Sequence, residues 1–466
     1  MKLMWFKNDL RLADNPALFH ACSDGDPVVA LYMFTPKQWQ QHDKSAIQVD
    51  FIRRHLHVLQ QELAEINIPL CVLTIDDFAA VPNALISFCQ QHKIDSVFYN
   101  QEYEWNERQR DQACNDVLDQ AGIAIGIFED QCLVAPHQVK TGSGDWYKVF
   151  TPFRKNWQSQ LDEHPPQIYP IPDPCPTNPI QHGDAIPASI DGFESIDDAR
   201  QALWPAGSAQ AYQRLEDFLD QHVQDYGDSR NRPDLDQTSR LSPYLAIGAI
   251  GNRQCYVVAQ RYLSESHQAV STWISELCWR DFYRHVLVGF PHVSRGQAFN
   301  IDVDKKINWS YDQADFERWK DGKTGVPIVD AAMRALKAEG WMHNRLRMVT
   351  AMFLTKDLLI DWRLGEQYFS QQLIDGDLAS NNGGWQWSAS TGTDAAPYFR
   401  IMNPFTQGET HDPDGVYIRR WLPELASLQG SQVHDLKRRQ TCTAYPAPMV
   451  DHKAARQRAI EQFKAS

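Results

Sequence analysis

Short apolar runs alternate with amphipathic stretches through the first 130 residues, and no other feature of the chain restricts its fold as strongly. The apolar runs have the length of strands, and the stretches between them carry apolar residues at the spacing of a helix. A repeated strand–helix order predicts a parallel, doubly wound α/β sheet that ends near residue 130. The expected strands are Leu3–Phe6, Val28–Phe34, Leu70–Thr74, Ser96–Tyr99 and Ala124–Phe128, and the expected helices are Asn15–Cys22, Ala46–Ile66, Asn83–His92 and Glu107–Gln120.

The turn after the first strand lacks the glycine pattern of a dinucleotide-binding site. The segment Lys7–Arg11 stands where G-x-G-x-x-G would begin, so a nicotinamide cofactor is not expected. Parallel sheets nevertheless bind ligands beside the carboxyl ends of their strands. The polar side chains predicted to cluster there are Asn8, Asp9, Asn100, Gln101, Glu102, Asn106 and Glu107.

A proline-rich stretch divides the chain. Residues 165–187 contain eight prolines, and proline restricts φ and lacks a backbone donor, which predicts an extended linker. From about residue 208 helical periodicity replaces the strand pattern. We therefore expect an α/β domain at 1–130, a connecting segment at 131–207 and an all-helical domain at 208–466. The helices expected in the last of these are Ala209–Val223, Thr272–Val288, Ile328–Ala338, Asn344–Leu359 and Glu366–Leu373.

Charge and cysteine content narrow the range of partners and compartments. The formal net charge of −14 argues against a nucleic-acid partner, unless the arginines concentrated between residues 230 and 400 share one face. Nine scattered cysteines without a C-x-x-C pair indicate a reducing, cytoplasmic compartment, with neither a disulfide framework nor a zinc site. No apolar run is long enough to span a bilayer, so we expect a soluble protein without a membrane partner.

Signatures of hydrolytic and metal-dependent enzymes are missing from the sequence. Neither G-x-S-x-G nor H-E-x-x-H occurs, and no metal site is expected. Asp321–Gly325 contains the GKT of a P-loop, but Glu317 stands at the position of the first glycine of that motif. We expect a turn there, before a helix that begins near Ile328. Difficult chemistry would therefore require an organic cofactor.

The stretch Asp375–Pro404 combines glycines, short polar side chains and two tryptophans. Turn residues of this kind usually form an irregular surface loop. The tryptophans favour a ligand pocket instead, because loops seldom carry so much ring area without burying it. The pocket interpretation expects close backbone approach and positive φ at Gly376, Gly383, Gly384 and Gly392.

Two helix-forming segments carry groups suited to phosphates or ion pairs. In Asp236–Leu245, hydroxyl side chains precede a helix and can hold a phosphate, although capping of the helix explains one of them equally well. In Trp341–Thr350, Arg345 can reach a phosphate and Arg347 can neutralise Asp375 or Asp377, with a solvated basic helix as the alternative. The hydroxyls are those of Thr238, Ser239 and Ser242.

One face of the expected helix Thr272–Val288 mixes aromatic and charged side chains at spacings of three and four. A buried stripe normally avoids glutamate and arginine, so the face is either part of a site or a packed helix with a solvated ion pair. The face comprises Trp273, Glu276, Trp279, Arg280 and Tyr283.

Several ordered motifs together resemble the photolyase/cryptochrome family of flavoproteins, and in detail the bacterial class I photolyases that act on cyclobutane pyrimidine dimers. The resemblance covers nearly the whole chain and implies an α/β domain, a long linker and a helical domain that binds FAD. The motifs are WFKNDLRLADN, YKVFTPF, TSRLSPYL, WISELCWRDFYRHV, KTGVPIVDAAMR, WMHNRLRM and DGDLASNNGGWQW.

The resemblance implies a set of FAD contacts, in which Asn381 would lie at the N5 edge of the flavin. A neutral amide there permits both reduced forms of the flavin, whereas plant cryptochromes have an aspartate. The implied contacts are Tyr226, Thr238, Ser239, Arg240, Leu241, Ser242, Trp273, Asn344, Arg347, Asp375, Gly376, Asp377 and Asn381.

The implied reaction is light-driven electron transfer from reduced FAD to a pyrimidine dimer that has been flipped out of UV-damaged DNA; base flipping by photolyases is itself a standard example. Trp279 and Trp387 match the rings on which the dimer stacks, and Glu276 matches the carboxyl that hydrogen bonds to it. Asn344 and Met348 complete the cavity by resemblance. The implied phosphate contacts are Arg230, Arg280, Arg345 and Arg400.

Two further sites follow from the resemblance. Trp385, Trp362 and Trp309 match the tryptophans that carry an electron from the surface to photoexcited oxidised flavin. An antenna chromophore, a methenyltetrahydrofolate, would be held by His42, Asn106 and Glu107, with a deazaflavin or an empty site as the alternatives.

The main rival function is that of a cryptochrome, a blue-light receptor without repair activity. A (6-4) photolyase would be expected to show histidines in the lesion cavity, where this chain has Asn344 and Met348 near His343; a single-strand-specific relative fits less well for the same reason. We expect a monomeric bacterial enzyme in the cytoplasm that associates with the nucleoid when it is bound to DNA.

Overall fold

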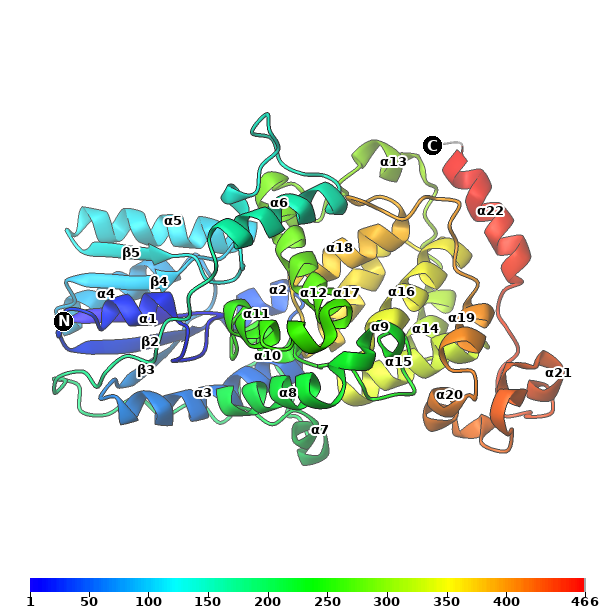
Figure 1. Ribbon diagram of the computed structural model, residues 1–466, viewed down its shortest axis with the longest axis horizontal. Coiled ribbons are helices and arrows are strands. Elements are labelled where there is room, and N and C mark those ends of the chain that lie inside the picture. Colours follow the sequence, from blue (N-terminus) through cyan, green and yellow to red (C-terminus); the bar gives the residue numbers. More distant parts are fainter. Residues whose placement is uncertain (465–466) are drawn as a thin grey trace. The chain divides into compact units, whose positions relative to one another are not determined.

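The computed structural model describes residues 1–464 and confirms the predicted doubly wound sheet (Figure 1). Five parallel strands are ordered β3-β2-β1-β4-β5. The two central strands β1 and β2 are buried along their whole length, as expected of strands covered on both faces. The strands are β1 (Lys2–Phe6), β2 (Val28–Phe34), β3 (Leu70–Thr74), β4 (Ser96–Asn100) and β5 (Ala124–Phe128).

Helices pack on both faces of this sheet. Leu3 and Trp5 of β1 share an apolar core with Leu85 of α4 and Leu118 of α5. The alternate residues of β1 point to the opposite face, and α1 lies against β1 and β4. The expected helices are confirmed to within two residues at each end. Their bounds are α1 (Pro16–Ala21), α3 (Ala46–Glu65), α4 (Val81–His92) and α5 (Trp105–Gln120), and the sequence did not reveal the short α2 (Pro36–Gln41).

After β5, the regular secondary structure of the described chain consists of helices, apart from one isolated bridge between Ser310 and Ile360. The proline-rich residues 165–187 form neither helix nor strand, as predicted. The helices are α6 (Phe150–Glu163), α7 (Asp198–Leu203), α8 (Ser208–Gln221), α9 (Tyr226–Ser229), α10 (Ser242–Ile247), α11 (Asn252–Gln260), α12 (Leu263–Gly289), α13 (Ile301–Lys306), α14 (Gln313–Lys320), α15 (Pro327–Glu339), α16 (Asn344–Met352), α17 (Trp362–Gln372), α18 (Leu378–Ala389), α19 (Pro404–His411), α20 (Val416–Trp421), α21 (Leu436–Arg439) and α22 (His452–Lys464).

Three of the predicted helices have different limits in the structure. The helix expected at Glu366–Leu373 begins one turn earlier, at Trp362. The helix expected at Asn344–Leu359 ends as an α-helix at Met352 and continues as a π-helical turn over Phe353–Asp357. The helix α12 begins well before Thr272, and Ser266 interrupts its regular geometry. Short side chains that hydrogen bond to nearby backbone groups favour such breaks, and these are difficult to locate from periodicity alone.

The chain forms two compact units that interleave along the sequence. The first, unit 1, contains residues 1–224, 239–294 and 374–379, and the second, unit 2, contains residues 225–238, 295–373 and 380–466. These limits are not those expected from the sequence at residues 131 and 208. The division into an antenna domain, a connecting segment and a catalytic domain stays a prediction.

The turn before α15 confirms that Asp321–Gly325 is not a P-loop. The buried carboxylate of Asp330 accepts hydrogen bonds from the backbone N–H groups of Thr324 and Gly325 and from the hydroxyl of Tyr445. Burial raises the pKa of Asp330 despite these bonds. The polar groups of the turn are therefore occupied within the core of unit 2.

The central part of Asp375–Pro404 is not the irregular surface loop that was the alternative to a pocket, and the positive φ expected at its glycines is wrong. Leu378–Ala389 forms the helix α18, which contains both Gly383 and Gly384, and none of the four glycines has a positive φ. A Cβ on Gly392 would lie 2.8 Å from that of Gln386, so close backbone approach is confirmed there. Burial of Trp385 offsets the helix cost of the glycines, which is about 1 kcal/mol each.

Candidate functional site

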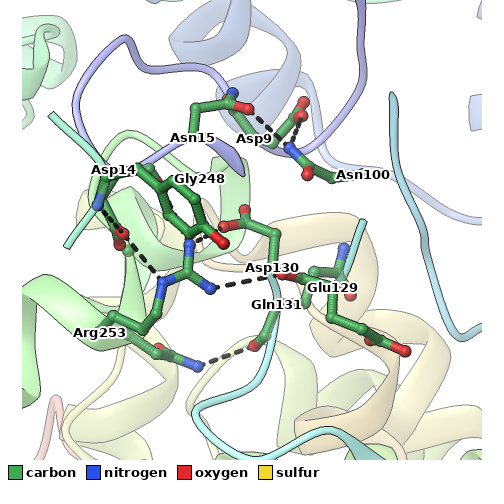
Figure 2. Close-up of polar contacts among 12 residues, drawn as sticks. Asp9, Asp14, Asn15, Asn100, Glu129, Asp130, Gln131, Gly248 and Arg253 are labelled. Carbon is green, nitrogen blue, oxygen red and sulfur yellow. Dashed lines mark hydrogen bonds and ion pairs between the residues drawn. The ribbon is translucent and has the colours of Figure 1, made fainter. Parts of the chain in front are cut away.

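Polar side chains gather at the carboxyl ends of the central strands, as predicted (Figure 2). The amide of Asn100 donates to Asp9 at 2.6 Å and to Asn15 at 2.8 Å, and the amide of Asn8 donates to Glu102 at 2.6 Å. Burial raises the pKa of Asp9 to about 6. Because these groups satisfy one another, they join strand ends and loops within unit 1.

A second buried network in the same figure ties the first strand to α11. The guanidinium of Arg253 donates to Asp14 at 2.9 Å and to Asp130 at 2.7 Å, and Arg11 donates to the other oxygen of Asp130. Burial raises the pKa of Asp130, but the two arginines outweigh it and the net shift is downward. The carboxylate is therefore held ionised as a structural ion pair.

The three residues expected to hold an antenna lie together in unit 1. The amide of Asn106 lies 2.8 Å from Nε2 of His42, and Nδ1 of His42 lies 3.5 Å from Glu107. Burial, with the neighbouring carboxylates Glu104 and Glu102, raises the pKa of Glu107 to about 8. Burial, Lys44 and Arg110 lower the pKa of His42 to about 4, so a neutral imidazole meets a carboxyl that is largely protonated.

The segment before α10 has the donor groups that a phosphate needs. Its predicted members Thr238, Ser239 and Arg240 precede the helix, and Ser242 is its first residue. Leu241 occupies the N-cap position and no side chain caps the helix, so capping does not account for the hydroxyls. Arg240 has φ +46°, an unusual conformation for a residue with a side chain, and such strain is concentrated at functional positions.

Trp273 of α12 joins this segment, because its indole N–H lies 3.4 Å from the hydroxyl of Ser239. Tyr226, also expected at the FAD site, belongs to the short helix α9 of unit 2, and Arg230 ends that helix with its guanidinium 5.5 Å from the Tyr226 ring. The expected FAD contacts are therefore distributed over both units.

The acidic turn before α18 is held by basic side chains of α12. Asp377 accepts from Arg284 at 2.5 Å and lies 3.4 Å from Arg280, and the carbonyl of Gly376 accepts from Gln48. Arg280 is only 13% exposed and also donates to the carbonyl of Leu245. This geometry suits the positioning of Asp377 better than contact with DNA phosphate. Arg284 was not among the site residues expected from the sequence, although it lies one helical turn beyond Arg280.

Two of the expected phosphate contacts are brought together in unit 2. Arg345 donates twice to the side-chain oxygen of Asn231, at 2.8 and 3.2 Å, and burial together with nearby Arg230 lowers its pKa. Burial, Arg345 and Arg232 lower the pKa of His411 to about 4. A cluster of positive charge thus exists despite the acidic chain. Arg400, in the segment before α19, is exposed.

Asn381 has a fixed orientation on α18. Its amide nitrogen donates to the carbonyl of Glu366 and to the hydroxyl of Ser370, both at 3.0 Å. With both amide protons engaged, the remaining polar atom is Oδ1, which is an acceptor. The side chain is therefore arranged to accept a hydrogen bond from a donor.

The three tryptophans expected to carry an electron all belong to unit 2. Trp385 is buried, and its ring centroid lies 4.9 Å from that of Phe369. It also packs against Gly365 of α17, where an added Cβ would lie 2.2 Å from the Trp385 ring. Trp362 is the first residue of α17 and is fully buried, whereas Trp309 is half-buried. The indoles of Trp309 and Trp362 both donate to one oxygen of Asp304 at 3.1 Å.

The expected lesion contacts come from three helices. Glu276 and Trp279 belong to α12 of unit 1, and the ring of Trp279 stacks on Phe150 with a centroid separation of 3.6 Å and an interplanar angle of 6°. Phe150 covers one face of Trp279, so a base could stack only on the other. In unit 2, α16 carries exposed Asn344 together with half-buried Met348 and Arg347, and α18 carries half-buried Trp387.

Two family models match this chain over most of its length. One describes a DNA photolyase domain and matches residues 2–173, and the other describes the FAD-binding domain of DNA photolyase and matches residues 273–465. The chain belongs to the DNA photolyase family. The resemblance expected from the sequence motifs is confirmed, as is a photolyase fold that uses FAD as its cofactor.

Curated photolyase relatives match over their full length. Deoxyribodipyrimidine photo-lyases of Salmonella typhimurium and Escherichia coli are 46% and 43% identical, over 100% of this chain and 98% of each relative. Among solved structures, a bacterial class III photolyase from Agrobacterium tumefaciens superposes with a TM-score of 0.89 at 32% identity, covering 100% of this chain and 97% of that one. A Synechocystis cryptochrome superposes at 0.88 with 29% identity, covering 99% and 98%.

Neither a membrane-spanning helix nor a metal-binding cluster occurs among residues 1–464. No helix in this range has the length and hydropathy of a membrane span. No group of three histidine, cysteine, aspartate or glutamate side chains in the same range is arranged to hold a metal ion.

Proposed function

We propose that this protein repairs cyclobutane pyrimidine dimers in DNA under blue light, with reduced FAD as the electron donor. The observation that carries the proposal is similarity over the full chain to enzymes named deoxyribodipyrimidine photo-lyase. FAD supplies the light-driven transfer of one electron to the dimer and its return, so the reaction has no net redox change. The tasks of the protein are to bind, orient and desolvate both partners.

The residues fit an FAD. The hydroxyls and backbone donors before α10 suit its phosphates. Arg280 and Arg284 fix the turn that contains Asp377 and so order a second set of expected contacts. Asn381 offers an oriented acceptor, as reduced flavin requires at its N5–H group.

The helix α12 provides the main contacts to the lesion, through Trp279 and Glu276. Trp279, supported by Phe150, provides a rigid surface for a flipped base, and stacking of this kind is worth about 1–3 kcal/mol per base. That gain offsets the few kcal/mol needed to unstack a nucleotide, a cost that is smaller for a damaged pair. Glu276 would hydrogen bond to the pyrimidines, and Trp387, Asn344 and Met348 would complete the cavity. Arg230, Arg345 and Arg400 would contact phosphates.

The test is a repair assay with the purified holoenzyme. The protein is reduced, mixed with UV-irradiated DNA and exposed to blue light, and the loss of cyclobutane dimers is counted. We expect light-dependent loss that the dark control lacks. FAD binding without repair would favour the alternative, a cryptochrome-type light receptor, for which the close superposition on the Synechocystis protein provides the structural precedent.

We further propose that the antenna is methenyltetrahydrofolate, held by His42, Asn106 and Glu107. A pterin ring offers both donors and acceptors, and a protonated carboxyl beside a carboxamide can pair with both. Absorption spectra of the purified protein and of its extracted chromophores test this. Glu107→Ala is expected to lose the folate and retain FAD, and a deazaflavin or no second chromophore in the wild type would contradict the proposal.

Oligomeric state and location form the last part of the proposal. We propose a monomer that acts in the cytoplasm and gathers on the nucleoid when DNA is damaged. Sedimentation of the holoenzyme, with and without an irradiated duplex, would test the first statement. Fluorescence microscopy of a tagged chain before and after UV exposure would test the second.

A further inference from the structure

The carboxylate of Asp304 connects the two outer tryptophans of the expected electron path. Its Oδ1 atom accepts a hydrogen bond from Nε1 of Trp309 and another from Nε1 of Trp362, both at 3.1 Å. Asp304 lies in α13 and Trp362 begins α17, so the shared contact brings together residues far apart in the chain. The side chain of Asp304 is only 11% exposed, which keeps water largely away from both bonds.

Arg363 makes the two indoles electrostatically different. Its guanidinium donates to Oδ2 of Asp304 at 2.7 Å and, more weakly, to Oδ1 at 3.5 Å. Its central carbon lies 4.4 Å over the ring of Trp362. A cation over a ring opposes positive charge on that ring. Trp309 instead meets the edge of Phe463, with centroids 6.2 Å apart. Positive charge left by an oxidation is therefore favoured on Trp309 over Trp362.

We propose that Asp304 is the base that takes the indole proton of Trp309 when this residue is oxidised. The inference rests on the proposed function and on the electron path through Trp309, Trp362 and Trp385 that the family resemblance implies. One electron leaves the Trp309 ring and passes through Trp362 and Trp385 to photoexcited FAD. The N–H bond of Trp309 then breaks, its electron pair remains on nitrogen, and the proton bonds to Oδ1 of Asp304. A neutral indolyl radical and a neutral carboxyl result.

The transfer of the proton to Asp304 slows the return of the electron to Trp309. An oxidised indole is a far stronger acid than a neutral one, and the acceptor is already at hydrogen-bond distance, so no diffusion is needed. Once the proton has moved, the electron cannot return to Trp309 without the proton. Asp304 thereby prolongs the charge separation.

The geometry is tested first, without light. In protein labelled with ¹⁵N at its tryptophans, Asp304→Asn keeps an oxygen acceptor but removes the charge. We expect the indole N–H resonances of Trp309 and Trp362 to shift together while the remaining indole signals keep their positions, which also shows that the variant folds. A shift of only one of the two, or of neither, would overturn the shared-acceptor geometry.

The proton transfer is tested by flash photolysis of the FAD-bound protein. Asp304→Asn is expected to slow conversion of the radical cation to the neutral radical by about 100-fold, the lower end of what a positioned base contributes. Its matched control is Asp302→Asn, which changes an exposed carboxyl of the same helix and should behave as wild type. If Asp304→Asn forms the radical normally and its conversion rate is unchanged, the role of Asp304 as the base is refuted, whereas the tryptophan path is not.

A separate outcome identifies failure of the underlying path. If the wild type forms no tryptophan radical, the path itself is refuted, and the role of Asp304 is refuted with it. Trp309→Phe should abolish the long-lived radical, which assigns the signal to Trp309. A persistent neutral radical in that variant would place the proton transfer on another residue and overturn the proposal.

Discussion

The indole of Trp385 rests directly on the backbone of Gly365, where a Cβ would lie 2.2 Å from the ring. Gly365 is within α17, three residues after Trp362, so the absence of a side chain lets one tryptophan approach the turn that carries the other. Two elements of the expected electron path are thus brought together by a residue that has no chemistry of its own.

Gly365→Ala should therefore displace Trp385 and destabilise the protein. Overpacking a core costs about 1–3 kcal/mol, which exceeds the roughly 1 kcal/mol that alanine gains over glycine in a helix. Urea unfolding measures the change in the free energy of unfolding. Gly384→Ala is the matched control in α18, where a new Cβ meets nothing within 4 Å, and it should not destabilise. Equal effects of the two substitutions would contradict the packing argument.

Trp309→Phe should block photoreduction of oxidised FAD while repair by enzyme that is already reduced continues. Phenylalanine fills much of the same space but is much harder to oxidise. Steady illumination with an external reductant, monitored by the flavin spectrum, gives the rate. Trp421→Phe changes a half-buried tryptophan of α20 outside the expected path and should leave the rate unchanged. Normal photoreduction in Trp309→Phe would exclude the path.

Trp279→Ala should weaken binding of irradiated DNA by about 5- to 150-fold, because loss of one stacking platform costs roughly 1–3 kcal/mol. Affinity for undamaged duplex should change little, since no base is flipped there. Trp279→Phe retains a ring over Phe150 and should retain most of the affinity. Titrations with labelled duplexes measure all three, and an equal loss for damaged and undamaged DNA would argue against a stacking role.

Arg230→Ala should make DNA binding less sensitive to salt. Each phosphate contact releases about one counterion, so the slope of log K against log salt should fall by about 1 for the loss of one contact. Arg438 of α21 is exposed and lies outside the expected interface, and Arg438→Ala provides the control. If Arg230→Ala leaves the slope as steep as in wild type, its assignment as a phosphate contact is wrong.

His55 should make stability fall as the solution is acidified. Its Nδ1 accepts from the backbone N–H of Gly207 at 3.1 Å and its Nε2 lies 2.6 Å from the carbonyl of Leu10, so the neutral ring is bound. Burial lowers the pKa of His55 from 6.5 to about 4. The unfolded chain therefore binds more protons between these values, and stability is lost as the pH falls through this window.

The size of this effect follows from linkage. Between pH 7.5 and 5 the free energy of unfolding should drop by about 2 kcal/mol on account of His55. Urea unfolding at the two pH values measures it, and His55→Gln, which cannot titrate, should lack that part of the drop. Other buried groups, among them Asp9, shift in the opposite sense, so the difference between the two proteins is the diagnostic quantity. Parallel pH profiles would show that His55 binds protons equally in the folded and unfolded states, so that folding does not lower its pKa.

Strands and helices with long hydrophobic periodicity could be predicted from the sequence, whereas local departures from regular helix geometry could not. The strands and the flanking helices follow from hydrophobic periodicity that repeats over many residues, as at Ala46–Glu65. At α18, a composition that is typical of a loop forms a helix, in which Gln386 donates to Asn382 and Asn382 donates to Glu366. Glycine and asparagine favour loops only while no neighbouring element offers such bonds.

The amino-acid sequence by itself determined the α/β order, the helical remainder and, through its motifs, the family and the residue types of the FAD and lesion sites. Tertiary structure alone decided which residues support them: Phe150 behind Trp279, Gly365 beneath Trp385, and Asp304 between Trp309 and Trp362. Periodicity reports the face of an element that is buried. It carries no information about which distant side chain meets that face, because that choice depends on the packing of separate elements.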